Sequence, residues 1–326
     1  MSSKKVFIII VNYNGFKDTI ECIESVVNLK YQRFQIIIID NASQDDSVNQ
    51  IKNWAKYTGN LDMIISNSNS LSRIKSADEK IILIHSLLNL GFAGGNNIGI
   101  QFAISREDGD FIWLLNNDTI VNELSLNHYI EYADSTPEKI GIIGCKIMEY
   151  YDRTIIQAAG GGKLIKPLGH SFLLGREKDD GQFDKPVKID YIHGASMFIP
   201  MGFIKDIGLM SEEYFLYFEE LDWSERGKKR GWKTGYCYKS VIYHKGGAST
   251  GTPGSYLKKS LASSFSDFYF QRSKILFTKK FYWFYIPTVY LSFLLIFANR
   301  IRRKQINRIP QLIKLLLNPK SAAFDR

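Results

Sequence analysis

Two oxygen-bearing side chains, Asn116 and Asp118, stand directly after the apolar run at residues 111–115 (FIWLL). Side chains two residues apart at a strand end can both turn toward one hard divalent cation, such as Mg²⁺ or Mn²⁺. Such a site uses few protein ligands and leaves other positions for substrate phosphates. His244 follows the apolar run at residues 238–243 and is a candidate third ligand if the fold brings it close. The competing interpretation is an Asx-turn, because Asn and Asp both favour turns.

A second cluster places Glu219, Glu220 and Asp222 at the start of a predicted helix that runs to Gly231. Repulsion between the three carboxylates is expected to raise at least one pKa. Asp222 is spaced to pair with Arg226, whereas Glu220 points about 100° away from Glu219 and is free to face a cleft. The alternative is a solvated acidic first turn, which the helix dipole favours. Flanking aromatic residues favour an apolar pocket instead, and their rings are good platforms for sugar faces: Tyr214, Phe215, Tyr217, Phe218 and Trp223.

A glycine-rich segment at residues 91–97 (GFAGGNN) opens another predicted helix. Its spacing fits neither the G-x-G-x-x-G pattern of dinucleotide-binding sites nor the phosphate-binding loop of nucleoside triphosphatases. Glycine lets a ligand approach the backbone, and the amides at a helix start favour anions. Close packing of the helix against the sheet is the alternative.

The elements that must position these residues are four apolar runs, at residues 6–11, 34–39, 81–84 and 111–115, which we predict to be strands. Helices are expected between them, at residues 47–56 and 91–104 among others. The alternation predicts βαβ units and a doubly wound α/β fold with a mostly parallel sheet flanked by helices. Ligands of such sheets bind outside the carboxyl ends of the strands. Polar side chains stand at three of these ends: Asn12, Tyr13 and Asn14; Asp40; and Asn116 with Asp118.

Two segments interrupt this alternation. Residues 57–80 are rich in Ser, Asn and charge, and are predicted to be irregular. Residues 157–185 contain six glycines and are predicted to form a mobile loop or hairpin beside the site.

Charge is distributed unevenly along the 326 residues. The net charge is +9, but residues 299–326 hold eight basic side chains and one acid, so this tail supplies +7 of it. The rest of the chain is close to neutral. A basic, apolar tail on a neutral body indicates an anionic membrane surface and argues against a nucleic-acid partner.

The cysteines and the N-terminus favour a reducing compartment. Cys22, Cys145 and Cys237 are far apart and form no C-x-x-C pair, so they are predicted to be reduced thiols. The first apolar run is too short for a signal peptide and has no small-residue cleavage site. We therefore expect the protein in the cytoplasm.

An uncharged run at residues 281–298 holds eight aromatic residues and Pro287. At about 1.5 Å per residue it would barely cross a hydrocarbon core of roughly 30 Å. Lys279 and Lys280 precede it and basic residues follow it, so charge gives no inside–outside sense. An interfacial helix, a true span and a soluble packing helix all remain open. The aromatic richness favours the interfacial helix, and with it a lipid-linked acceptor.

Taken together, the motifs resemble the family 2 glycosyltransferases of the GT-A fold, most closely bacterial rhamnosyltransferase-type enzymes that build cell-surface polysaccharides. The resemblance covers about residues 5–250, with the motifs in the family's order. They lie at residues 11–15 (VNYNG), 39–45, 89–97, 114–119, 193–197 (HGASM), 219–226 and 243–247.

The resemblance implies a role for each site by position. The donor, a dTDP- or UDP-linked sugar, would contact Asp40, which reads the pyrimidine, and Asn12, Tyr13, Asn14, Gly94, Asn96, Asn97, Asn117, Lys245 and Arg272. The divalent metal, Mg²⁺ or Mn²⁺, would be held by Asn116, Asp118 and His244. The acceptor, a lipid-linked or other saccharide, would lie near Trp223, Gly194 and Ala195. The catalytic acids would be Glu219, Glu220 and Asp222, with Glu220 as the base.

The chain departs from the family pattern at two positions. Asn116 replaces the first Asp of the D-x-D motif, which weakens the protein's own hold on the metal and leaves more of it to the diphosphate. Glu220 is one methylene longer than the commoner Asp. The implied reaction is a single displacement at the anomeric carbon, in which the base takes the proton of the acceptor hydroxyl and the configuration inverts.

The extent of the resemblance predicts a catalytic domain at residues 1–255, and the apolar, basic composition of the tail predicts a helical membrane-associating segment at residues 256–326. The protein is then expected to lie on the inner face of the cell membrane. Three other functions remain open. They are a polyprenyl-phosphate glycosyltransferase, a nucleotidyltransferase, and a non-catalytic protein that binds a nucleotide sugar or saccharide.

Overall fold

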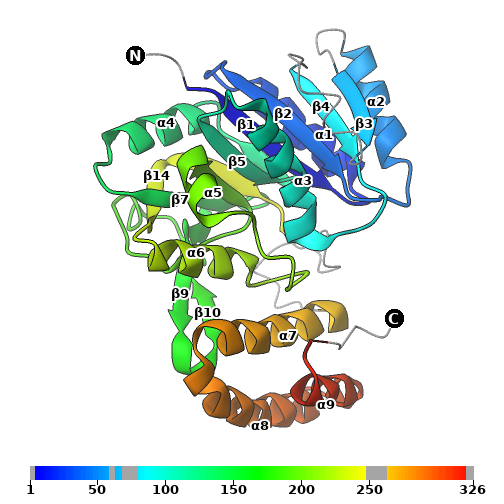
Figure 1. Ribbon diagram of the computed structural model, residues 1–326, viewed down its shortest axis with the longest axis vertical. Helices are drawn as coiled ribbons and strands as arrows, with labels where there is room; N and C mark the ends of the chain where they lie inside the picture. The colour runs from blue at the N-terminus through cyan, green and yellow to red at the C-terminus, as the bar shows by residue number, and fades with distance from the viewer. Residues whose placement is uncertain (1–3, 59–62, 68–79, 247–262, 321–326) are drawn as a thin grey trace.

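The computed structural model describes residues 4–58, 63–67, 80–246 and 263–320 of the chain. It shows an α/β body built on one large sheet, and a layer of helices from the last part of the chain that lies below this body (Figure 1). The predicted α/β class is confirmed.

One half of the sheet is parallel and comes from the first part of the chain. Its strands lie in the order β5–β1–β2–β4–β3, and all four neighbouring pairs are parallel. Val11 pairs with both Ile39 and Asn116, so the carboxyl ends of β1, β2 and β5 meet at one edge. The four predicted strands are confirmed as β1 (Val6–Asn12), β2 (Phe34–Asp40), β4 (Ile81–His85) and β5 (Phe111–Asn116).

The prediction that residues 57–80 are irregular is wrong in part. Met63–Asn67 forms β3, which pairs in parallel with β4 at the sheet edge. Its sequence, MIISN, is a short apolar run inside a polar stretch, so neighbouring composition concealed it. Residues 59–62 and 68–79 lie outside the described residues.

The other half of the sheet is mixed. The strand β13 is antiparallel to β5 and β7, and β14 is parallel to β7 but antiparallel to β6. This pairing brings His244, the last residue of β14, opposite Thr119. The strands of this half are β6 (Thr119–Val121), β7 (Ile140–Glu149), β8 (Ile155–Ala159), β11 (Glu177–Lys178), β13 (Ser196–Pro200) and β14 (Lys233–His244).

Helices cover both faces of the sheet, which explains why its central strands, such as β1 and β2, are almost entirely apolar. In β1, Ile8 and Ile10 enter the core under α1, α2 and α4, whereas Phe7 and Ile9 enter the core under α3, α5 and α6. Successive strand residues face opposite sides, so burial on both sides needs a continuous apolar run. The helices are α1 (Phe16–Val27), α2 (Ser47–Tyr57), α3 (Gly91–Arg106), α4 (Ser125–Ser135), α5 (Met201–Ile207) and α6 (Glu219–Lys229).

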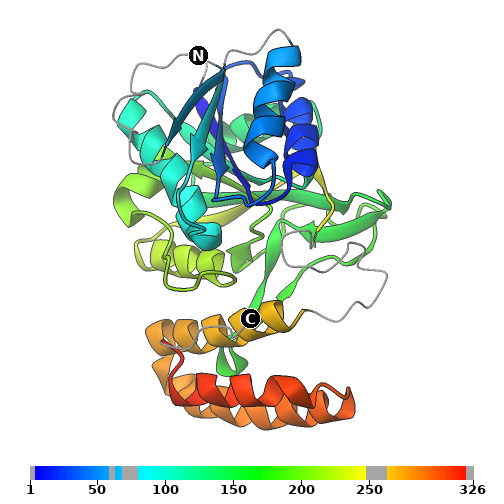
Figure 2. The same ribbon diagram turned by 90° about the vertical axis from the view of Figure 1, so that its right-hand side faces the viewer.

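A small sheet projects from the body toward the C-terminal helices (Figures 1 and 2). It consists of β9 (Gly161–Ile165), β10 (His170–Leu173) and β12 (Tyr191–Ile192), with a 3-10 turn, Lys166–Leu168, joining β9 to β10. A hairpin was one of the two predictions for residues 157–185, and β9 and β10 form it.

The C-terminal layer consists of α7 (Ser264–Phe281), α8 (Ile286–Arg302) and α9 (Ile309–Leu317), with short 3-10 turns between them. Its helices share a core that includes Phe268, Val289 and Leu312. The uncharged run at residues 281–298 is not one helix, because α7 ends at Phe281 and Pro287 lies in the first turn of α8. Proline fits there because the first helical amides need no partner within the helix.

The described residues contain one helical stretch that is long and apolar enough to cross a membrane, Trp283–Arg302. Only 11% of its apolar window is buried against the rest of the protein. Leu291, Leu294 and Leu295 are among its exposed side chains.

Candidate active site

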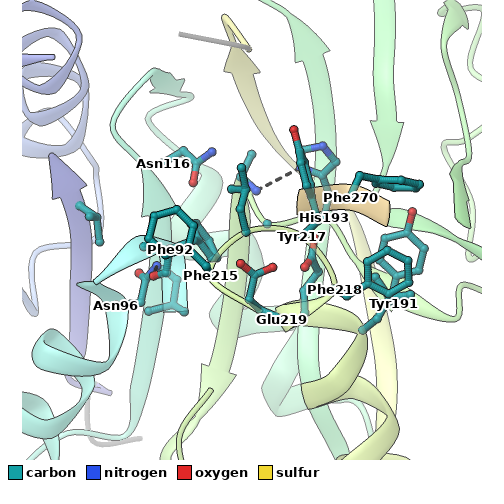
Figure 3. A pocket seen from close by; sticks show the side chains of 18 of the residues that line it. Phe92, Asn96, Asn116, Tyr191, His193, Phe215, Tyr217, Phe218, Glu219 and Phe270 are labelled. Atoms are coloured by element: carbon teal, nitrogen blue, oxygen red, sulfur yellow. Dashed lines mark hydrogen bonds between the residues drawn. The ribbon is translucent and has the colours of Figure 1, made fainter. Parts of the chain in front are cut away.

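A cavity of about 560 Å³ lies beyond the carboxyl ends of β1 and β5. One wall comes from these strand ends and the start of α3. The opposite wall comes from α6, α7 and the β9–β10 hairpin. Figure 3 shows Asn96 and Asn116 on one side of it and Tyr191 and Phe270 on the other.

The polar residues at the strand ends form a continuous hydrogen-bond chain beside the cavity. Asn117 donates to Thr19 at 3.0 Å, and Thr19 donates to Asn12 at 2.7 Å. Asn12 in turn donates to Asp40 at 2.9 Å, and Asp40 lies 2.8 Å from the ring of His85. This series of hydrogen bonds therefore links the ends of β1, β2, β4 and β5. Its polar side chains are already paired with one another before any ligand binds.

Only some of these residues reach the cavity wall. Tyr13 and Asn117 line the cavity, whereas Asn12 and Asp40 are fully buried behind it. Asn14 accepts a hydrogen bond from the amide of Gln44 at 2.7 Å and so fixes the loop after β2. A second cavity of about 380 Å³, also lined by Tyr13, adjoins this loop.

The structure brings Asp118 and His244 together, although 126 residues separate them in sequence. The carboxylate of Asp118 lies 3.1 Å from Nε2 of His244, and both side chains are nearly buried. Burial opposes charge on each, but their mutual attraction lowers the pKa of Asp118 and raises that of His244. Gln157 lies 2.6 Å from Nδ1 of His244 and fixes the ring orientation.

Asp118 and His244 could bind a divalent cation, but they do not supply enough ligand atoms to complete its coordination. Asp118 offers carboxylate oxygen, His244 offers imidazole nitrogen, and Asn116 lines the same cavity with an amide oxygen, a set that suits Mg²⁺ or Mn²⁺. No cluster of three or more His, Cys, Asp or Glu side chains suited to a metal occurs among the described residues. The remaining positions would therefore fall to the substrate.

Glu219 and Glu220 line the opposite wall, where Glu219 lies among the rings of Phe92, Phe215 and Phe218 (Figure 3). Glu219 is 1% exposed, so the alternative of a solvated acidic turn is wrong. Burial raises the pKa of Glu220 to about 7. Burial, and then the charge of Glu220, raise the pKa of Glu219 well above its ordinary value. The predicted rise in pKa is confirmed in direction, with burial as a larger cause than the predicted repulsion, so both carboxyls hold protons more readily than exposed ones.

The two acids are also incompletely satisfied. One carboxyl oxygen of Glu219 and one of Glu220 are buried without a hydrogen-bond partner among the described residues. Leaving a buried polar group without a partner costs about 1–3 kcal/mol of folding stability. These two oxygens can therefore accept hydrogen bonds from a ligand.

Asp222 and Trp223 do not line the cavity. Asp222 is fully buried and accepts hydrogen bonds from Tyr214 at 2.9 Å and Arg226 at 2.6 Å, which confirms the predicted pairing with Arg226. Trp223 is also fully buried and donates to the carbonyl of Gly208 at 2.9 Å. Both side chains lie on the core side of α6, so the structure does not bring them to an acceptor or to the reacting atoms.

Aromatic residues before α6 have an uncommon backbone conformation. Phe215, Tyr217 and Phe218 have φ angles of 68°, 67° and 74°. The left-handed conformation costs an L-residue about 1–2 kcal/mol, so tertiary contacts must hold this turn.

The glycine-rich segment is explained mainly by packing. A Cβ atom on Gly95 would lie 2.9 Å from the side chain of Val11 in β1, and one on Gly91 would lie 2.4 Å from the carbonyl oxygen of Phe215. This supports the packing alternative. Asn96 lines the cavity, but the amide of Asn97 is buried and donates to Glu212 at 2.7 Å and to the carbonyl of Met210.

Lys245 and Arg272, the predicted phosphate contacts, do not line the cavity. Lys245 pairs with Asp18 at 2.6 Å and with Glu21, so its charge is already compensated. Arg272 donates to the backbone carbonyls of Glu213 and Tyr214 at 2.9 and 3.3 Å.

The structure adds residues to the wall that sequence reasoning did not assign. His193 lines the cavity next to Gly194 and Ala195, and burial lowers its pKa to about 3, so it is neutral. It belongs to the 193–197 motif, which is a signal that could have found it. Phe172 and Arg176 line the wall from the hairpin region, and no local pattern indicates this.

Gly194 lies beside the carboxyl group of Glu220. A Cβ atom there would lie 3.7 Å from Oε1 of Glu220. Glycine therefore keeps the space beside this carboxyl open.

Comparison with known proteins identifies relatives. A family model described as glycosyl transferase family 2 matches residues 7–205. The low-salt glycan biosynthesis hexosyltransferase Agl10 of Haloferax volcanii is 27% identical over 207 residues, which is 62% of this chain and 64% of Agl10. Glycosyltransferase GlyG of Streptococcus pneumoniae is 25% identical over 37% of this chain and 32% of GlyG. The chain thus aligns with less than two thirds of either relative.

Solved structures resemble the fold. The mannosyltransferase PcManGT of Pyrobaculum calidifontis, in complex with GDP-Man and Mn²⁺, covers 97% of this chain and 86% of its own at a TM-score of 0.51 and 12% identity. GalNAc-T7 with UDP, GalNAc and Mn²⁺ covers 74% of this chain and 44% of its own, with a TM-score of 0.54 and 16% identity. At these identities the likeness concerns the fold alone.

Proposed function

The chain belongs to glycosyltransferase family 2, and from this premise we propose that it is an inverting glycosyltransferase. It would move a hexose-type sugar, rhamnose by sequence resemblance, from a dTDP- or UDP-sugar to a hydroxyl of a lipid-linked saccharide. The observation that carries the proposal is one cavity with the carboxyl pair Glu219–Glu220 on one wall and the Asp118–His244 pair on the other.

Glu220 is the proposed base. Its pKa of about 7 leaves it substantially ionised at neutral pH yet basic enough to accept a proton from the acceptor hydroxyl. Glu219, whose pKa is raised well above its ordinary value, would stay protonated and leave Glu220 available as the base. Gly194 leaves room beside Glu220, which supports placing the acceptor hydroxyl there.

Asn116, Asp118 and His244 are the proposed residues for the divalent cation. When bound, Mg²⁺ or Mn²⁺ would neutralise charge on the leaving diphosphate. Gln157 would hold His244 in the orientation that presents Nε2. The likeness to structures that contain Mn²⁺ supports this choice of cation.

The nucleoside would bind at the strand ends. Tyr13, Asn96 and Asn117 reach the cavity wall and are the proposed donor contacts. Asp40 lies behind this wall, so it would affect the nucleobase of the donor only indirectly, through the loop that Asn12 and Asn14 hold in place.

The C-terminal layer is the proposed membrane contact, with the enzyme on the cytoplasmic face. Exposed apolar side chains of α8 stand next to basic ones such as Arg302 and Arg303, which suits an anionic membrane surface. We favour the interfacial arrangement over a span. The reason is that Arg300 of α8 pairs with Asp267 of α7 at 2.6 Å, while Thr288 donates to Pro167 of the hairpin. A spanning α8 would carry one of these ends across the bilayer and break its contact.

The decisive experiment supplies UDP-, dTDP- and GDP-sugars with Mn²⁺ or Mg²⁺ to the purified protein and vesicles that carry a lipid-linked saccharide. The expected result is release of one nucleoside diphosphate, loss of turnover with EDTA, and a product of inverted anomeric configuration. Transfer to polyprenyl phosphate itself would establish the alternative acceptor. Nucleotide binding without turnover of any donor would instead support a binding protein.

Flotation with vesicles tests the membrane part separately. Wild type should float with vesicles that contain anionic lipid, and Leu294→Ser/Leu295→Ser should not. Equal flotation of both proteins would contradict the proposed surface.

A further inference from the structure

The turn that precedes α6 controls the direction in which the catalytic helix starts. Phe215, Tyr217 and Phe218 are left-handed, and Glu219 and Glu220 are the next two residues. The carbonyl of Phe218 accepts the amide of Asp222 at 2.9 Å, so the turn is continuous with the first turn of the helix. Relaxation of these backbone angles would therefore redirect both acids.

The helix α7 binds the backbone of this turn directly. Ser273 is fully buried and lies within hydrogen-bond distance of two carbonyls, Leu216 at 2.9 Å and Tyr214 at 3.3 Å. Arg272 donates from Nη1 to the carbonyl of Glu213 at 2.9 Å. Adjacent residues of α7 thus hold carbonyls along the segment that leads into α6.

Side chains of α7 also hold the aromatic rings of the turn. Phe218 packs against Phe270 and Phe277, with ring centroids 5.5 and 5.3 Å apart. Tyr217 shares a hydrogen bond of 2.5 Å with Ser266. Figure 3 shows Phe218 and Phe270 on the same side of the cavity.

The far end of α7 and the residue after it bind the body of α6. Lys280 lies 2.5 Å from the buried carboxylate of Asp222. Tyr282, one residue beyond α7, donates to Glu225 at 2.6 Å. The same helix therefore fixes both the turn and the helix that follows it.

We propose that α7 is a positioning element for the base, in which Arg272 and Ser273 hold the left-handed turn that aims Glu219 and Glu220 into the cavity. The proposal rests on the proposed function and assigns Arg272 to backbone carbonyls instead of donor phosphates. It also makes α7, which lies outside the matched residues 7–205, part of the catalytic structure.

Ser273→Ala is the first test, because it removes one hydroxyl and adds no volume. The matched control is Thr278→Val, since Thr278 is equally buried on α7 but its hydroxyl donates only to its own helix. We expect kcat of Ser273→Ala to fall about 10–100-fold, in line with the cost of a small misplacement. Affinity for UDP or dTDP with Mn²⁺ should not change. In Ser273→Ala, the acid limb of the pH profile of kcat should also move to lower pH, because a loosened turn exposes Glu220 to water and so reduces the rise in its pKa.

Arg272→Lys separates geometry from charge. Lysine keeps the positive charge but cannot hold two carbonyls in the same way, so a positioning role predicts lower kcat at unchanged nucleotide affinity. Weaker nucleotide binding at unchanged kcat would instead place Arg272 on the donor and overturn the assignment.

Hydrogen–deuterium exchange gives a readout that does not need turnover. Ser273→Ala should exchange faster than wild type and Thr278→Val across residues 213–222, with the strands β1 and β5 unaffected. Unchanged exchange and an unchanged kcat profile would overturn the proposal. If wild type transfers no sugar but exchange still changes as expected, the proposed function fails while the structural role of α7 stands.

Discussion

The two walls of the cavity are built in opposite ways. On the strand side, Asn117, Thr19, Asn12 and Asp40 form one hydrogen-bond chain in which each group has a partner. On the acid side, two carboxyl oxygens have no partner among the described residues, and a left-handed aromatic turn precedes them. The polar groups of the strand side are hydrogen-bonded without a ligand, whereas those of the acid side are not all hydrogen-bonded.

This difference teaches which wall is suited to binding and which to reaction. A wall whose polar groups are already oriented can bind a nucleotide with little rearrangement. Unsatisfied carboxyls and strained backbone are costly, and such features concentrate at functional sites, where they keep a group poised. Substitutions on the two walls should therefore have separable effects.

The largest expected effect is on the acid side. Glu220→Gln should lower kcat by about 10²–10⁴-fold, because the amide cannot accept the acceptor proton. Nucleotide affinity should stay unchanged when it is measured by calorimetry with UDP or dTDP. Glu213→Gln, an exposed acid just before the turn, is the control. Wild-type turnover in Glu220→Gln would move the base elsewhere.

The strand side should give the complementary result. Asp118→Asn should weaken Mn²⁺ binding in the presence of nucleoside diphosphate by at least about tenfold, since it removes the carboxylate next to His244. A Mn²⁺ titration measures this, with Asp110→Asn at the opposite end of β5 as control. If Asp118→Asn changed kcat alone, the two walls would not divide binding from reaction.

The smallest effect concerns stability. The folded protein retains protons on Glu219 and Glu220 that the unfolded chain loses above a pKa of about 4.3. Stability from this pair is therefore full at low pH and falls as pH rises toward and past about 7, the pKa of Glu220.

Glu219→Gln tests this sign. It should raise the free energy of unfolding at pH 8 by on the order of 1 kcal/mol and leave it unchanged at pH 4, as measured by urea denaturation. The exposed Glu107→Gln should show no such dependence. An equal change at both pH values would mean that the acids are not held protonated by the fold.

The strand side was largely predictable from sequence, because its signals are local. Runs such as VFIIIV and FIWLL can only be buried on both faces, and the polar residues that end them must meet at one edge. His244 was predicted to join Asp118 only if the fold brought the two close together. The register of β14 against β6 does this, and it cannot be read from the sequence.

The acid side was less predictable, because distant parts of the chain build it. Glu219 lies among the rings of Phe92 in α3 and of the turn, and that turn is held by Ser273, more than fifty residues later. Trp223 was predicted to face the acceptor. The residue at which α6 begins decides which side of the helix Trp223 occupies, and its ring packs against Phe203 in the core. Arg272 and Lys245 were assigned from the family resemblance and their charge, and the partners that the structure gives them are not visible in the sequence.

The position of β14 has a consequence for the order of assembly. This strand lies between β7 and β6, so its last residues complete the sheet beside Asp118 only after the chain has been made as far as His244. Chains fold from the N-terminal side during synthesis, and β1, β2, β4 and β5 can pair before that point. A ribosome-bound chain shorter than about 244 residues would therefore carry the paired ends of β1, β2, β4 and β5 without the histidine that lies beside Asp118.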